Sequence, residues 1–224
     1  MKKILIAKSI FKSYTSNKTK NIILENIDLN VFENESIAIM GASGEGKTTL
    51  LHILAGLENI DLGNIEILGE KKYSNKLINE KIGFIFQSYN LLNDLSVIDN
   101  ILMPAKIARK NISKTSIYYN RAIKMLEEIN LINKKDDLAI HLSGGEKQRT
   151  SIARAFCNNP EIIFADEPSG NLDSKNSKVI HDLLINSCKT YKKTLILATH
   201  DLELAKMCDK IFQLKDKKLT SYTF

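Results

Sequence analysis

Short apolar runs alternate with longer amphipathic stretches along most of this chain. Residues 23–32 alternate apolar and polar positions, which predicts a half-buried strand, and the apolar run 36–40 predicts a buried strand. Residues 47–56 have a helical pattern that ends in a glycine, a common way to close a helix. Two further strands are predicted at residues 63–68 and 81–86.

The middle of the chain has a helical pattern. From about residue 100 to 132 we expect mainly helix, with Ser113 as the N-cap of one helix. Apolar residues at helical spacing form its predicted buried face: Tyr118, Ala122, Met125, Leu126 and Ile129.

The last third returns to alternation between helices and strands. A helix is expected after Gly145, and two more at about residues 175–191 and 202–208. Strands are predicted at 161–165 and 194–198, and a C-terminal hairpin at 210–222 with its turn at Asp216 and Lys217. Helices that alternate with apolar strands favour a parallel sheet. The fold class predicted for the whole chain is α/β, with a mostly helical insertion.

Composition narrows this picture only a little. The chain has 224 residues, a length that suits one domain, and 43% hydrophobic residues. No apolar run approaches the roughly 18 residues of a membrane-spanning helix, and the N-terminus does not resemble a signal peptide, so we expect the protein to stay in the cytosol. The net charge of +6 comes mostly from dispersed lysines, and we expect no nucleic-acid partner.

A glycine-rich loop follows the second predicted strand. GASGEGKT, residues 41–48, fits the pattern G-x-x-x-x-G-K-[ST] between a strand and a helix. Glycines let backbone N–H groups surround phosphate oxygens, while Lys47 reaches the β and γ phosphates and Thr48 can bind Mg²⁺. The residues predicted to bind ATP here are Gly41, Ala42, Ser43, Gly44, Glu45, Gly46, Lys47, Thr48 and Thr49.

Four polar residues follow other apolar strands. Asp166 is expected at the carboxyl end of its strand, where it can hold Mg²⁺. Glu167 comes next and can orient and deprotonate the attacking water. His200 follows a parallel strand and can reach the γ-phosphate, and Gln87 can bind Mg²⁺ or position water.

These motifs occur in a recognisable order. GASGEGKT, Gln87, LSGGE at residues 142–146, the strand ending in Asp166 and Glu167, SGNLD at 169–173, and His200 together resemble ATP-binding cassette (ABC) ATPase domains. The resemblance covers essentially the whole chain. It implies a P-loop NTPase fold in one domain, residues 1–224, with a parallel-sheet core, an N-terminal antiparallel β part and a helical subdomain at about 88–155.

The resemblance also implies how the chain would work. Such domains dimerise head to tail, with each ATP between the phosphate loop of one copy and LSGGE of the other. Tyr14 matches the aromatic residue that stacks on adenine, Glu167 the catalytic base and His200 the switch histidine, with Lys47 also catalytic. The residues expected to face the ATP of the opposing subunit are Ser143, Gly144, Gly145, Glu146 and Asp173.

Within the family, the segments at residues 87–105 and 165–173 most resemble ATPases of the lipoprotein-releasing (Lol) type. Such a subunit would use ATP and Mg²⁺ to drive separately encoded integral membrane subunits at the cytoplasmic face of the inner membrane. ATPases of macrolide exporters and of antimicrobial-peptide resistance systems are the alternative. Soluble ABC ATPases that act on DNA are disfavoured because the chain has no long coiled coil, and ribosome-acting factors because it has a single cassette.

Overall fold

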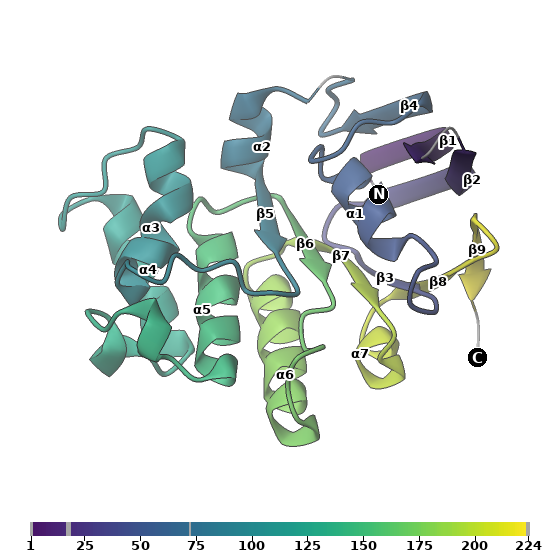
Figure 1. The fold of residues 1–224 in the computed structure, drawn as a ribbon. Helices are drawn as coiled ribbons and strands as arrows, with labels where there is room; N and C mark the ends of the chain where they lie inside the picture. The colour runs from purple at the N-terminus through teal and green to yellow at the C-terminus, as the bar shows by residue number, and fades with distance from the viewer. Residues whose placement is uncertain (1, 17–18, 72, 223–224) are drawn as a thin grey trace. The chain divides into compact units, whose positions relative to one another are not determined.

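The computed structural model describes residues 2–16, 19–71 and 73–222. These residues form two compact units, one of Met1–Ser74 with Lys192–Phe224 and the other of Asn75–Tyr191. Figure 1 labels their helices and strands. No described helix is long and apolar enough to cross a membrane.

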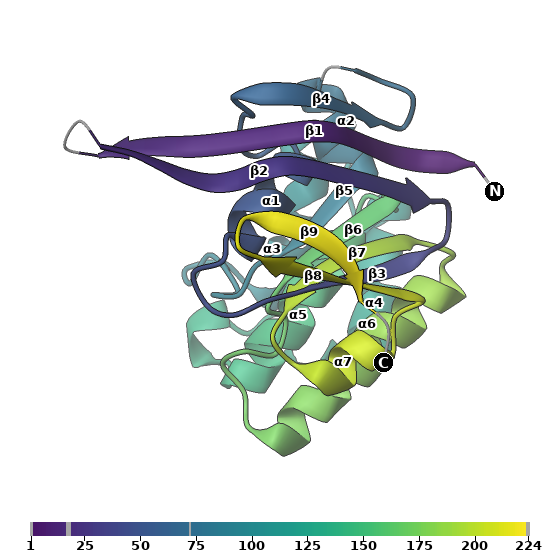
Figure 2. The ribbon, with the colours of Figure 1, turned by 90° about the vertical axis from the view of Figure 1, so that its right-hand side faces the viewer.

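The first unit contains a three-stranded antiparallel sheet. β1 (Lys3–Ser16) lies between β2 (Thr19–Phe32) and β4 (Leu62–Ile67), as Figure 2 shows. Alternate residues of β2 are buried from Ile27 to Val31, and Leu24 is buried as well, so the predicted half-buried strand is confirmed. β1 is a long strand that the sequence pattern did not single out.

A second sheet region of the same unit is mainly parallel. β3 (Ser36–Met40) pairs in parallel with β7 (Thr194–Thr199) and β8 (Lys210–Lys215), and β9 (Lys218–Tyr222) is antiparallel to β8. The hairpin turns at Asp216 and Lys217, whose φ angles are 48° and 68°, as a two-residue turn between twisted strands requires. The predicted hairpin is confirmed.

Two helices of this unit pack on the parallel strands, α1 (Lys47–Leu54) on β7 and α7 (Leu202–Lys206) on both β3 and β7. Gly56 follows α1 with φ 74°, and the Leu57 N–H donates to the His52 carbonyl at 2.8 Å. This is the glycine-closed helix end that the sequence predicts.

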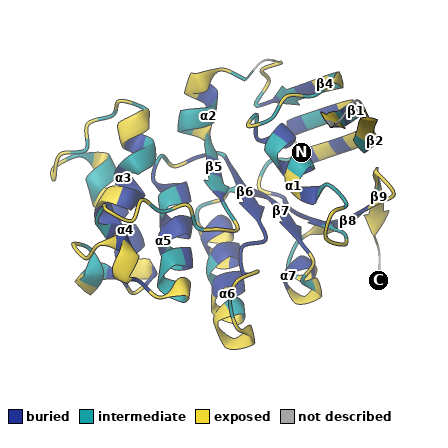
Figure 3. Ribbon diagram, viewed as in Figure 1, coloured by how far each residue is buried: buried dark blue, intermediate teal, exposed yellow. Residues whose placement is uncertain are grey.

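The second unit combines two parallel strands with the remaining helices. β5 (Ile82–Ile85) pairs with β6 (Ile162–Asp166), which is buried along its whole length, as Figure 3 shows. The helix α5 (Gly144–Phe156) packs against α3 (Val97–Ile107), α4 (Ile117–Glu128), β5 and α6 (Ser174–Thr190). The remaining helical elements are α2 (Asn75–Lys81) and two short 3₁₀ turns, Ile132–Lys134 and Ala139–His141.

One predicted helix cap was wrong. Ser116, not Ser113, caps α4, and its Oγ accepts a hydrogen bond from the Tyr119 N–H at 3.1 Å. Ser113 lies in a preceding turn, where its carbonyl oxygen accepts from the Ser116 N–H at 2.8 Å. Because that turn comes first, α4 begins three residues later than the serine pattern suggested. Four of the five predicted core residues are buried, whereas Tyr118 is only half-buried.

The predicted helical stretch is also interrupted. α3 begins at Val97 under a Ser96 cap, earlier than expected, and residues 108–116 separate it from α4. The helix α2 was not predicted, because its polar sequence carries little apolar periodicity. The α/β class, with parallel strands and an antiparallel N-terminal part, is confirmed.

Candidate functional site

The phosphate loop connects β3 to α1. Gly44 and Gly46 have φ angles of 87° and 96°, which favour glycine. A Cβ atom on Gly46 would lie 2.7 Å from Ile23 Cγ2, and one on Gly41 would lie 2.5 Å from the Leu214 carbonyl oxygen. Close contacts therefore require glycine at positions 41 and 46, in addition to the motif.

The first turn of α1 is suited to an anion. Its N-cap is Gly46, which has no side chain to bind the first N–H groups of the helix. Lys47 is buried, and its ammonium donates to the carbonyl oxygens of Gly41 at 2.9 Å and Ala42 at 3.1 Å. Thr48 is exposed on the same turn. A helix N-terminus without a side-chain cap, an ammonium and a hydroxyl match the groups that bind phosphate and its metal ion.

Three other predicted site residues belong to the first unit: Glu45, Tyr14 and His200. Glu45 accepts a hydrogen bond from the Asp216 N–H at 3.1 Å, which ties the loop to the β8–β9 turn. Tyr14 is 43% exposed on β1, with the Lys12 ammonium 5.0 Å from the centre of its ring. His200 is exposed, one residue after β7. The roles of Tyr14 and His200 stay predictions.

In the second unit, two carboxylate side chains lie at the end of β6 and directly after it. Asp166 is its last residue and is buried, and Glu167 follows with φ 42°, a left-handed conformation that is strained for glutamate. The Glu167 carbonyl oxygen accepts from the Gly170 N–H at 3.0 Å. A Cβ on Gly170 would lie 3.5 Å from Glu167 Cβ and 3.6 Å from Gln87 Nε2. Glu167 Cβ and Gln87 Nε2 therefore both lie close to Gly170.

Asn171 adds a contact that sequence reasoning missed. Its Nδ2 donates to the Gln87 carbonyl oxygen at 3.0 Å. The residue lies within SGNLD, so the motif itself was the available signal. Asp173, in the same motif, caps α6 by accepting from the Asn176 N–H at 2.9 Å, and the hydrogen bonds from Asn176 lower its pKa.

The LSGGE motif forms the start of α5. Ser143 is its N-cap, and Ser143 and Glu146 make a capping box in which each side chain binds the other residue's backbone N–H. The Ser143 hydroxyl also donates to Glu146 Oε2 at 2.9 Å. Gly144 and Gly145 are the first two residues of the helix.

Lys134, which the motif did not indicate, completes this end of α5. Its ammonium lies 2.5 Å from Glu146 Oε1. This hydrogen bond, with those from Ser143, lowers the pKa of Glu146 to about 2. The carboxylate is therefore charged at neutral pH and has a cation beside it.

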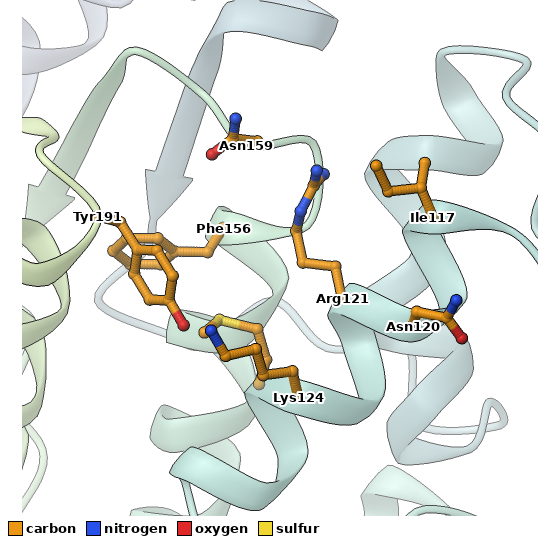
Figure 4. Close-up of a pocket in the computed structure, with 8 residues that line it drawn as sticks. Ile117, Asn120, Arg121, Lys124, Phe156, Asn159 and Tyr191 are labelled. Carbon is orange, nitrogen blue, oxygen red and sulfur yellow. The ribbon is translucent and has the colours of Figure 1, made fainter.

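One cavity of the second unit, of about 290 Å³, contains none of the predicted site residues. It lies between α4, the end of α5 and Tyr191, with Arg121 and Lys124 at its edge (Figure 4). Nothing in its lining relates it to the phosphate loop or to LSGGE.

Comparison with known proteins decides the family. The family model described as ABC transporter matches residues 24–170, which include the phosphate loop, LSGGE and both carboxylates of β6 and its following turn. The chain belongs to the ABC transporter family. The recognition made from the motifs, the predicted fold and the predicted ATPase class are thereby confirmed.

Two relatives and two solved structures illustrate the similarity. The lipoprotein-releasing system ATP-binding protein LolD of Protochlamydia amoebophila is 45% identical over 86% of each chain, and that of Wigglesworthia glossinidia brevipalpis 42% over 96% of each. The cassette MJ0796, solved as a dimer with ADP and phosphate, superposes with a TM-score of 0.87 at 32% identity, covering 98% of this chain and 100% of the other. For cbiO1 from Clostridium perfringens the TM-score is 0.83 at 27% identity, with 98% and 88% covered.

Proposed function

We propose that this chain is the ATP-hydrolysing subunit of a lipoprotein-releasing ABC complex. It would work as a head-to-tail homodimer on separately encoded membrane subunits, at the cytoplasmic face of the inner membrane. The observation that carries the proposal is the similarity to lipoprotein-releasing ATP-binding proteins, which extends over most of both chains. The dimer of the related cassette MJ0796 supports the assembly.

ATP binds first to the phosphate loop in this proposal. The backbone N–H groups of residues 41–48 and the start of α1 hold the phosphates, and the Lys47 ammonium pairs with the β and γ phosphates. Tyr14 stacks on the adenine. Thr48, Gln87 and Asp166 would hold Mg²⁺, which supplies positive charge to the developing transition state. Their oxygen atoms are the donors that Mg²⁺ prefers.

Glu167 is the proposed general base. Its carbonyl oxygen is held by the hydrogen bond from the Gly170 N–H, and both its Cβ and the Gln87 amide lie close to that glycine. A carboxylate held in this way can accept a proton from the attacking water, while His200 stabilises the γ-phosphate. Glu167 is buried, so bulk solvent has little access to it.

The second copy contributes its LSGGE motif. Ser143, Gly144, Gly145 and Glu146 offer a hydroxyl and a helix N-terminus to the γ-phosphate of the opposing ATP, with Asp173 nearby in the dimer. ATP then binds the closed dimer more tightly than the open one, and this difference in affinity is what drives the membrane subunits.

The variant Glu167→Gln tests the ATPase part. It should bind ATP normally, hydrolyse it on the order of 10²-fold more slowly, and accumulate as an ATP-bound dimer. Turnover and dimer mass would be measured by phosphate release and light scattering. Hydrolysis at the wild-type rate would remove Glu167 from the role of base.

The lipoprotein part needs the membrane partner. The complex that co-purifies with this chain, placed in proteoliposomes with a lipoprotein, should release that lipoprotein only with ATP. ATP-dependent export of a drug or a peptide without lipoprotein release would replace the Lol assignment with the macrolide or resistance-type alternative.

A further inference from the structure

One arginine of α5 binds the backbone that follows Gln87. Arg154 donates from Nη2 to the Tyr89 carbonyl oxygen at 2.6 Å and from Nη1 to the carbonyl oxygen of Asn90. Its Nη2 also lies 3.5 Å from Ser151 Oγ on its own helix. Burial lowers the pKa of Arg154 to about 10, so the guanidinium stays charged at neutral pH.

The bound backbone is strained. Tyr89 and Asn90 have φ angles of 61° and 49°, two consecutive non-glycine residues in the left-handed region. This conformation persists only where the surroundings impose it. A planar guanidinium presents its N–H donors in a fixed orientation, whereas the three donors of a lysine ammonium can rotate. Arg154 is therefore suited to hold both carbonyl groups in this arrangement.

Tyr89 also reaches the other end of α5. A Cβ atom on Gly144 would lie 3.2 Å from Tyr89 Oη, and Gly144 is in the first turn of the helix whose last turn carries Arg154. Tyr89 thus contacts α5 through its backbone at one end and approaches it through its phenol at the other. Asn171 Nδ2 also donates to the Gln87 carbonyl oxygen at 3.0 Å.

We propose that Arg154 is a positioning residue for ATP hydrolysis. It holds the backbone of Tyr89 and Asn90 on α5, so that the segment that follows Gln87 keeps a fixed register against the helix that begins with the LSGGE residues. This inference rests on the proposed function, in which Gln87 and Ser143 act on nucleotide. It adds Arg154 as a residue that acts through the position of this segment.

Arg154→Lys is the first test. It keeps the charge and loses the fixed orientation of the donors, so kcat should fall about tenfold, as small displacements of reacting groups cause. The KM for ATP should stay within about twofold, because the phosphate loop is unchanged. Amide hydrogen exchange at residues 87–92 should become faster, a result that does not depend on activity.

A second substitution provides a rescue. Glycine adopts the left-handed region without steric cost, so Asn90→Gly added to Arg154→Lys should restore part of kcat and slow the exchange again. Arg121→Lys is the matched control. Arg121 also donates to a backbone carbonyl, that of Cys157 at 2.7 Å, but it does not bind the segment 87–90. It should leave kcat unchanged.

Asn90→Val tests the same geometry with Arg154 intact, which matters if Arg154→Lys does not fold. A β-branched residue disfavours the left-handed region, so kcat should fall while the KM holds. A wild-type protein without ATPase activity would overturn the proposed function. An active wild type with unchanged kcat in Asn90→Val, or in folded Arg154→Lys, would overturn the positioning role alone, as would the absence of any rescue by Asn90→Gly.

Discussion

Two helices that begin in glycine-containing motifs treat their first turns in opposite ways. α1 begins after Gly46, with no side chain on its first N–H groups. α5 begins at a capping box in which Ser143 and Glu146 satisfy each other's backbone, with Lys134 on the carboxylate. The first terminus is open to a ligand, whereas the second is already stable without one.

The difference indicates a division of labour. The first turn of α1 has no side-chain cap, so its N–H groups can face an anion directly, and α1 is suited to take ATP within a single copy. At α5 the Ser143 hydroxyl donates to Glu146, and it must leave that acceptor to donate to a phosphate. The ligand contact at α5 therefore replaces an existing bond, which suits a weaker, reversible step such as closure of a dimer.

The largest effect is expected at the phosphate loop. Lys47→Met keeps the apolar stem and removes the ammonium that pairs with the phosphates, a charge-assisted interaction. ATP affinity of the isolated chain should fall on the order of 10²-fold, and hydrolysis with it. Titration with a fluorescent ATP analogue measures the affinity. An affinity equal to wild type would mean that α1 does not hold the nucleotide.

The variant Ser143→Ala should distinguish the role of α5 from that of α1. ATP affinity of the single copy should not change, because the phosphate loop is intact, whereas hydrolysis should fall about tenfold through the loss of one donor to the γ-phosphate. Loss of the N-cap should also lower the free energy of unfolding by about 1 kcal/mol. Phosphate release and chemical denaturation give the two values. Weakened binding of ATP to the monomer would contradict the assignment of α5 to the opposing subunit.

Sequence reasoning succeeded where local rules decide the structure. The phosphate loop, the glycine that closes α1 and the Asp216–Lys217 turn each follow from a short pattern with one strongly favoured backbone. The predicted cap of α4 was wrong because a local rule cannot distinguish Ser113 from Ser116. The turn before the helix, in which Ser113 accepts from the Ser116 N–H, leaves Ser116 as the cap. Fold and motif positions were thus accessible from the sequence.

The contacts that support the site were not accessible in the same way. Lys134 lies twelve residues before Glu146, and Arg154 binds backbone more than sixty residues earlier in the chain. No periodicity or motif links such positions, because only tertiary packing brings them together. The chemistry of LSGGE was predicted, whereas the lysine beside its carboxylate was not.

The smallest expected effect concerns that lysine. The pKa of Glu146 falls from an ordinary 4.5 to about 2, chiefly through the hydrogen bond from Lys134. A depressed carboxyl pKa stabilises the fold above the unfolded value, and this contribution is lost as pH falls from about 4.5 to about 2. Since Lys134 is 42% exposed, solvent screening reduces its share to about 0.5 kcal/mol.

Lys134→Met should therefore lower the free energy of unfolding at pH 6 and lose this difference from wild type as the pH approaches 2. Urea denaturation across that range measures the difference. The control is Lys124→Met, because the Lys124 ammonium lies 3.9 Å from Glu128 within α4, away from the capping box of α5. A constant difference at every pH would show that Lys134 stabilises α5 by packing. A difference that vanishes in acid would show that the capping box of α5 depends on the charge of Lys134. The start of α1 has no side-chain cap and therefore no such dependence.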